Sequence, residues 1–271
     1  MNDAPRLSAL VETWRQAIAD FVALARSIPE EQWHLPTDLA GWSVKDNVAH
    51  TAHLEAVLAG GPEETTPVEE APHITGLSGL YTEQGVVARR GRDMGSLADE
   101  IEQATAKRYA DLLADPPTDG SASPPKTPRD VPWSVERLLS NRPFDVWMHE
   151  QDIRRAIGRP GGYDTLAARH AIAVCAGSLP MVVGKRVAPP VGTTVRIDVP
   201  DAAKRWTIAI GDDGRAARVS PVDDPSVRIT LGAEDFIVLM GGRRGVDATD
   251  PEIEGDAELG NAVLANLAVT P

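Results

Sequence analysis

The chain has 271 residues, enough for one large domain or two modest ones, each able to bury a hydrophobic core. Asp and Glu number 40 against 27 Lys and Arg, so the formal net charge is −13 and a nucleic-acid backbone would be repelled. The single cysteine, Cys175, cannot form an intramolecular disulfide, which is typical of a reducing compartment.

The N-terminus and the apolar runs indicate where the chain acts. Residues 1–6 are short and polar, without the apolar block and cleavage site of a signal peptide. No run approaches the roughly 18 apolar residues that cross a membrane. We therefore expect a cytoplasmic monomer or small homo-oligomer whose partners are small molecules, with neither nucleic acid nor membrane among them.

Helical patterns occupy the first part of the chain. Apolar residues recur at intervals of three and four, the spacing of one helix face. Ser43 follows a Gly-Trp turn and can cap one of these helices, which Gly60, Gly61 and Pro62 end. The predicted helices cover residues 7–28, 44–59, 77–92 and 97–114. A further helix contains 144–157, and Pro143 either kinks it or opens it at its first turn.

The pattern changes towards the C-terminus. Residues 165–187 are predicted helical with a break at Pro180. From Pro189, apolar and polar side chains alternate, as they do in half-buried antiparallel strands. Strands are predicted at 193–199, 205–210 and 227–231, and helices at 233–240 and 257–267. The fold class is therefore α+β, with a helical domain at 1–188 and a small domain with an antiparallel sheet at 189–271.

Polar residues occupy a face of the 144–157 helix that should be apolar. Asp145, His149 and Asp152 follow the i, i+4, i+7 spacing, which aligns them along one stripe. Their neighbours include Trp147 and Ile153, so the stripe is set among apolar side chains. A carboxylate and an imidazole one turn apart can both reach one cation.

The 44–59 helix carries a complementary stripe of Asp46, His50 and His53. If the two helices face each other in a bundle, one histidine from this helix and an Asp/His pair from the other supply three ligands to a cation. Three protein ligands leave a fourth position open, which is typical of a catalytic zinc ion. A surface ion pair or a hydrogen-bonded core histidine is the alternative for any one such pair.

Two sequence runs resemble a known family. Gly41–His50 and Asp145–Arg155 are similar to motifs of the mycothiol-dependent maleylpyruvate isomerase family, which belongs to the DinB-like metal-binding four-helix bundles. Fuller members of that family continue into a domain similar to sterol-carrier-protein folds, and 227–240 and 255–259 resemble the end of that domain. The resemblance thus covers nearly the whole chain.

The resemblance implies roles for particular residues. His50 and His149 match the two metal-ligand histidines of the family, and Asp145 matches the carboxylate ligand. The family pattern has Glu at that carboxylate, so the aspartate here is one methylene shorter. His53 is the fallback ligand. The implied cofactors are a divalent metal, with zinc favoured, and mycothiol as the thiol cosubstrate.

The chemistry implied by the resemblance is activation of a thiol at the metal, through which His50, Asp145 and His149 would act in catalysis. A metal-bound thiolate either adds to a conjugated double bond and leaves again, as in an isomerase, or stays attached, as in an S-transferase. The substrate is a small electrophile that can bear a carboxylate. The arginine cluster at 89, 90 and 92 is a candidate for pairing that carboxylate, but a solvated, charged helix end is the favoured interpretation, so these arginines are not counted among the site residues.

Two other classes of function stay open. A metal-dependent hydrolase would use metal-bound water, with Asp46, Asp152 or Glu150 as the base. A non-catalytic protein would bind an apolar ligand in its C-terminal domain and keep the metal for structure alone.

Overall fold

The computed structural model describes residues 3–270, and the chain divides between Ala168 and Arg169 into two compact units. Unit 1 is helical. Its helices are α1 (Ala4–Arg26), α2 (Val44–Leu58), α3 (Gly76–Val87), α4 (Met94–Ala114) and α5 (Val135–Ala156), with short 3₁₀ turns at Glu30–Gln32 and Pro128–Asp130.

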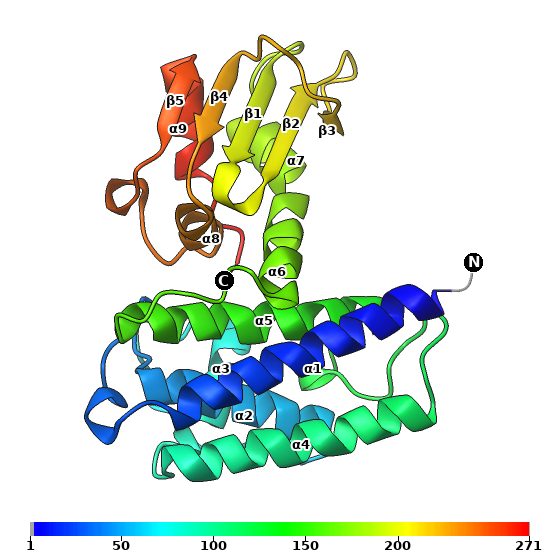
Figure 1. The fold of residues 1–271 in the computed structure, drawn as a ribbon, viewed down its shortest axis with the longest axis vertical. Helices are drawn as coiled ribbons and strands as arrows, with labels where there is room; N and C mark the ends of the chain where they lie inside the picture. Colours follow the sequence, from blue (N-terminus) through cyan, green and yellow to red (C-terminus); the bar gives the residue numbers. More distant parts are fainter. Residues whose placement is uncertain (1–2, 271) are drawn as a thin grey trace. The chain divides into compact units, whose positions relative to one another are not determined.

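Four long helices of unit 1 form a bundle, to which α3 is added (Figure 1). α1 packs against α4 and α5, while α2 packs against α3, α4 and α5. Large apolar side chains fill the space between them, among them the fully buried Trp14, Phe21, Leu97 and Trp147. The bundle therefore buries one continuous core, and it confirms the predicted helical domain with a four-helix arrangement.

Helix boundaries in unit 1 follow their capping residues. Ser134 caps α5 by accepting a hydrogen bond from the backbone of Arg137, so the helix begins nine residues before Phe144. Pro143 consequently lies inside α5 rather than at its first turn. Asp93 caps α4 through the backbone of Ser96, and α3 ends at Val87 instead of residue 92.

Unit 2 contains a five-stranded sheet with helices (Figure 1). Its strands are β1 (Thr194–Val199), β2 (Lys204–Ile210), β3 (Ala216–Val219), β4 (Val227–Thr230) and β5 (Glu252–Gly255). Its helices are α6 (Leu166–Gly177, which begins just before the division), α7 (Leu179–Met181), a π-helical turn at Val182–Val187, α8 (Ala233–Met240) and α9 (Ala257–Ala265), with 3₁₀ turns at Pro200–Ala202 and Val246–Ala248. The α+β class is confirmed.

The sheet is mixed, so the prediction of an antiparallel sheet was wrong at one pairing. The strand order is β3-β2-β1-β4-β5, and β1 pairs with β4 in parallel while the other pairs are antiparallel. Alternation of side chains reports which face is buried but carries no information on strand direction. Two edge strands, β3 and β5, were not predicted, because they are short and mostly exposed and therefore lack an apolar stripe.

The division between the units falls 20 residues before the boundary predicted at residue 188. The reason lies in the packing of the intervening segment. The π-helical turn packs against α9, and α7 packs against β3. A Cβ on Gly184 would lie 2.6 Å from the Cβ of Ala216, so the turn closely approaches the sheet. The segment is therefore part of the sheet's own unit.

One stretch, Leu166–Val187, is long and apolar enough to cross a membrane, contrary to the prediction from the sequence. Its 22 residues have a mean hydropathy of 1.5 over the most apolar window. Half of that window is buried in the protein, and core helices of soluble proteins meet the same criterion.

Candidate metal centre

The start of α2 fixes the position of its histidines. Ser43 and Asp46 form a capping box: the Ser43 hydroxyl accepts from the Asp46 backbone, and the Asp46 carboxylate accepts from the Ser43 backbone at 2.8 Å. The preceding Gly41 has φ of +79°, and its missing side chain leaves room for the His73 ring. The cap thereby fixes the residue at which α2 begins.

Three residues converge from α2 and α5. His50 Nε2 lies 3.6 Å from Asp145 Oδ2, and His149 Nε2 lies 3.8 Å from Asp145 Oδ1. One ligand atom of each residue falls within 4.8 Å of the other two. Tetrahedral bonds of about 2.1 Å place ligand atoms roughly 3.4 Å apart, so small side-chain adjustments bring these atoms to zinc geometry. The donor set of two imidazoles and one carboxylate fits a divalent cation.

The centre is buried except at its carboxylate. The side chains of His50 and His149 are 4% and 8% exposed, whereas that of Asp145 is 22% exposed. The two imidazole rings meet edge to face, with centroids 4.7 Å apart. Among the three side chains, Asp145 is therefore the one most exposed to solvent.

Hydrogen bonds orient the His149 ring. Its Nδ1 lies 2.8 Å from Asn47 Oδ1 and 3.5 Å from Asp152 Oδ2, both of which are acceptors. Nδ1 is therefore the donor in these contacts, and Nε2 is the ring nitrogen that faces Asp145. Metal-bound histidines commonly have an outer partner of this kind. His50 differs, since its buried Nδ1 has no hydrogen-bond partner among residues 3–270.

An indole ring covers both imidazoles. The Trp42 centroid is 4.9 Å from that of His50 and 5.8 Å from that of His149. Its Nε1 donates to Glu83 Oε2 at 2.8 Å, and Glu83 is itself paired with Arg90 at 2.7 Å. The ring is thus a fixed wall beside the centre.

The surroundings of the centre favour a neutral His50 and an ionised Asp145. Burial lowers the pKa of His50, which the Asp145 carboxylate opposes only in part. Burial alone would raise the pKa of Asp145, but the charge of Arg142 holds it well below its ordinary value. Arg142 donates to Asp145 Oδ2 at 2.9 Å. Both protonation states are those that bind a metal.

Two family models match this chain. Residues 14–154 match the mycothiol maleylpyruvate isomerase N-terminal domain, and residues 169–262 match the C-terminal domain of the same family. The chain belongs to the mycothiol maleylpyruvate isomerase family. No curated protein matches it.

Two solved structures have the same fold as this family member. A crystal structure of the mycothiol-dependent maleylpyruvate isomerase superposes with a TM-score of 0.55 at 15% identity, and a histidine-to-alanine mutant of that isomerase superposes with 0.54 at 14% identity. Each match covers 91% of this chain and 92% of the other. At this identity the likeness shows the fold alone.

Other residues considered from the sequence lie outside the centre. His53 packs on Tyr81, with ring centroids 5.1 Å apart, and neither of its ring nitrogens has a hydrogen-bond partner among residues 3–270. It is absent from the group of residues that can share one ion, so the structure favours His50 over this fallback. Cys175 is buried, and burial raises the pKa of its thiol to about 12, which leaves it unreactive.

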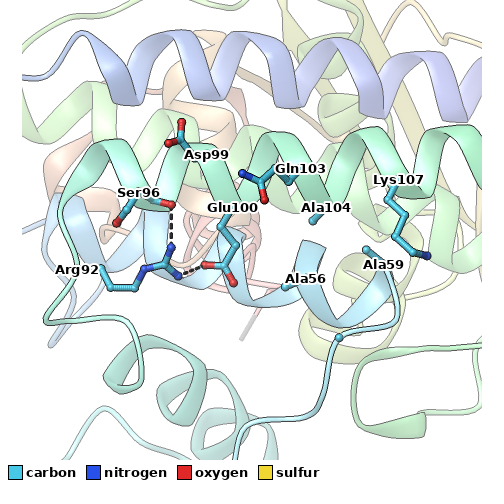
Figure 2. A pocket seen from close by; sticks show the side chains of 10 residues that line it. Ala56, Ala59, Arg92, Ser96, Asp99, Glu100, Gln103, Ala104 and Lys107 are labelled. Carbon is cyan, nitrogen blue, oxygen red and sulfur yellow. Dashed lines mark hydrogen bonds and ion pairs between the residues drawn. The ribbon is translucent and has the colours of Figure 1, made fainter.

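The three arginines of the cluster at 89, 90 and 92 form ion pairs with carboxylates of this same chain. Arg89 pairs with Glu100 at 2.8 Å and with Glu64 at 2.9 Å, and Arg90 pairs with Asp46 at 3.1 Å. Figure 2 shows Arg92 reaching Glu100 and the carbonyl of Ser96. The pocket drawn there has a volume of about 620 Å³, and its lining, from α2, α4 and the segments next to them, does not include His50, Asp145 or His149. These arginines therefore have a structural role in the bundle.

Three residues of the centre were not predicted as functional. Asn47, Trp42 and Arg142 orient or enclose the ligand candidates, but none of them is of a residue type that usually binds zinc. A signal was present for Arg142, because it precedes Asp145 by three residues and shares its helix face.

Proposed function

We propose that this family member is a metal-dependent enzyme that activates a small-molecule thiol for reaction with a small electrophile. Zinc is the proposed metal and mycothiol the proposed thiol. The observation that carries the proposal is the convergence of His50, Asp145 and His149 from two helices in the domain that matches the isomerase family. Three protein ligands leave a position open for an exogenous ligand.

A zinc ion held there would supply the charge that lowers the pKa of a coordinated thiol below its ordinary value of about 8.5. Three residues of this chain orient the candidate ligands or shield them from water. Asn47 holds His149 in one tautomer, and Arg142 keeps Asp145 ionised. Trp42 keeps water from one side of the imidazoles, which strengthens the electrostatic interactions of an ionised thiol.

Isomerisation and transfer share their first step and differ in the second. The thiolate forms a carbon–sulfur bond with the electrophilic carbon. In isomerisation of a conjugated double bond, the resulting single bond rotates, the carbon–sulfur bond breaks, and the double bond re-forms with the thiol regenerated. In S-transfer the carbon–sulfur bond persists and one thiol is consumed for each substrate. The ratio of thiol to product therefore separates the two reactions.

The hydrolase alternative is less well supported, because each carboxylate proposed as its general base already pairs with an arginine. Asp46 serves the α2 capping box and pairs with Arg90 at 3.1 Å. Glu150 pairs with Arg154 at 2.7 Å, and Asp152 pairs with Arg155. A general base needs a lone pair free to reach the attacking water. The thiol mechanism requires no such carboxylate.

The proposal is tested with the full-length protein, first by elemental analysis after incubation with zinc. We expect about one zinc per chain. The loaded protein is then mixed with mycothiol and a panel of electrophiles that includes maleylpyruvate, and both thiol and electrophile are followed. Turnover that needs both zinc and the thiol supports the proposal.

The matched control is His149→Ala, which should fold but lose zinc and turnover together. Turnover without added thiol would favour the hydrolase. Zinc binding with no turnover across the panel would favour the third class, a binding protein with a structural metal. A protein that takes up no zinc would contradict the proposal at its first step.

A further inference from the structure

A buried ionic bridge lies directly behind Asp145. Arg142 is fully buried, and its Nη1 donates to Asp145 Oδ2 at 2.9 Å. The Nε and Nη2 atoms of the same guanidinium donate to Glu55 Oε1 at 3.0 and 2.9 Å. Glu55 is also fully buried. One arginine of α5 thus joins the carboxylate of the candidate metal centre to a carboxylate of α2.

Glu55 is anchored by two further helices. Trp14 of α1 donates from Nε1 to Glu55 Oε1 at 3.2 Å, and Arg108 of α4 lies with its Nη1 3.5 Å from Glu55 Oε2. The Arg108 guanidinium stacks over the Trp14 ring, 4.6 Å from its centroid. Residues from all four long helices therefore hold the Glu55 carboxylate in place. Arg142 connects that carboxylate to Asp145.

Stability alone is a weak reason for such a network. Removing charges from water costs several kcal/mol per ion, and buried ion pairs often add no more stability than apolar residues of the same volume. The geometry around Asp145 suggests another reason. Arg142 engages Oδ2, which also lies 3.6 Å from His50 Nε2, while Oδ1 lies 3.8 Å from His149 Nε2 and has no contact with Arg142. The bridge leaves one carboxylate oxygen for a cation.

We propose that Arg142 is a positioning residue of the metal centre, which holds Asp145 by Oδ2 so that Oδ1 is presented together with the two imidazoles. The inference rests on the proposed metal site but not on the thiol chemistry. Without Arg142, the partly exposed carboxylate is free to rotate away.

The structure provides a matched control in Arg108. Both arginines are buried and both interact with Glu55, but only Arg142 interacts with Asp145. Arg142→Lys keeps the positive charge, yet a single ammonium cannot reproduce the planar fork that bridges two carboxylates. Arg108→Lys removes a guanidinium from the same Glu55 and leaves the Asp145 contact unchanged. The pair separates positioning of the metal ligand from balancing of a buried charge.

The experiment is a competition titration of zinc against a chromophoric chelator, with the full-length metal-free protein and circular dichroism to confirm folding. We expect Arg142→Lys to weaken zinc binding by about 10- to 100-fold, the range for loss of an outer partner of a metal ligand. Arg108→Lys should stay within a few-fold of the unsubstituted protein. Because no thiol is present, the result does not depend on the proposed reaction.

Unchanged zinc affinity in folded Arg142→Lys, or an equal loss in Arg108→Lys, would overturn the inference and leave Arg142 as a charge partner of Glu55. If Arg142→Lys does not fold, the double variant Glu55→Gln with Arg142→Gln replaces the ion pair by an amide pair without changing the net charge. The double variant should show the same loss of zinc affinity. If it binds zinc as tightly as the unsubstituted protein, the inference is also overturned. An unsubstituted protein that binds no zinc refutes the metal centre itself.

Discussion

Trp42 donates its indole hydrogen to the buried carboxylate of Glu83 at 2.8 Å, and this bond holds the ring over the two histidines of the candidate centre. The indole lies between solvent and an otherwise buried imidazole pair, only 4.9 Å from the His50 ring. Because Glu83 also pairs with Arg90, and Arg90 with Asp46, the wall is linked to the cap of α2. The helix start and the wall of the centre are therefore built from one polar network.

The position of Trp42 predicts an optical signal for metal binding. A bound cobalt(II) ion should quench Trp42 fluorescence, since the indole lies against both imidazoles. Trp42→Phe should remove most of the metal-dependent quenching while retaining a ring at the wall. The control is Trp206→Phe, which removes the tryptophan stacked on Phe236 in unit 2. Fluorescence titration with cobalt(II) measures both, and equal quenching in the two variants would contradict the arrangement.

A second prediction ranks the ligands. His50→Ala and His149→Ala each remove a buried imidazole that points at Asp145, so both should abolish high-affinity zinc binding. His53→Ala should cost far less, because the His53 ring packs on Tyr81 instead. His34→Ala, at an exposed histidine, is the control for loss of any imidazole. Zinc titration of the folded variants measures the order of these losses in affinity. Loss of binding in His53→Ala alone would show that His53, one turn along α2, is the ligand instead of His50.

The sequence predicts the ligand candidates because they follow helical periodicity. His50 is on one predicted helix and Asp145 and His149 on another, and a four-helix bundle brings such stripes together. Metal binding by these residues stays a prediction, whereas their proximity is now a structural fact. Asn47 and Arg142 could not be assigned in this way. The contacts of Asn47 with His149 and of Arg142 with Glu55 depend on the rotation of α2 relative to α5, and periodicity within one helix does not specify that rotation.

The fold, too, could be predicted from sequence patterns only within single helices and strands. Apolar periodicity located the five helices of unit 1, but the first nine residues of α5 were missed because they depend on Ser134 as a cap. In unit 2, the buried strands β1, β2 and β4 carried the alternation expected of a half-buried sheet. The parallel pairing of β1 with β4 is set by the route of the chain between them. Local sequence contains little information about that route.

A third prediction concerns pH and the stability of metal-free unit 1. Burial, with help from the Arg89 charge, lowers the pKa of His53 from 6.5 to about 4. Between these two pH values the unfolded chain binds a proton that the folded chain excludes, so stability falls as pH drops from 6.5 to about 4. A shift of that size corresponds to at most about 3 kcal/mol. His50 contributes with the same sign, because burial lowers its pKa as well.

Urea unfolding in the presence of a chelator, at several pH values across this window, measures the effect. Tryptophan fluorescence reports mainly unit 1, which contains every tryptophan except Trp206. His53→Asn should flatten the dependence of unfolding free energy on pH, whereas His34→Asn, at an exposed position, should leave it unchanged. If the unfolding free energy of His53→Asn depends on pH as steeply as that of the unsubstituted protein, protonation of His53 is not the cause of the pH dependence.

The packing of α3 against α2 gives the last prediction. Gly85 lies so close to His53 that a Cβ placed on it would be 2.2 Å from the imidazole ring, although its backbone is ordinary helix. Gly→Ala in a helix normally stabilises by about 0.5–1 kcal/mol, but overpacking costs about 1–3 kcal/mol. We expect the clash to dominate, so Gly85→Ala should lower the urea midpoint of unit 1. Gly91→Ala, where a Cβ meets nothing within 4 Å, should not lower it. Adding His53→Ala to Gly85→Ala removes the clashing ring and should recover part of the loss, and a raised midpoint in Gly85→Ala alone would mean that α3 does not rest on His53.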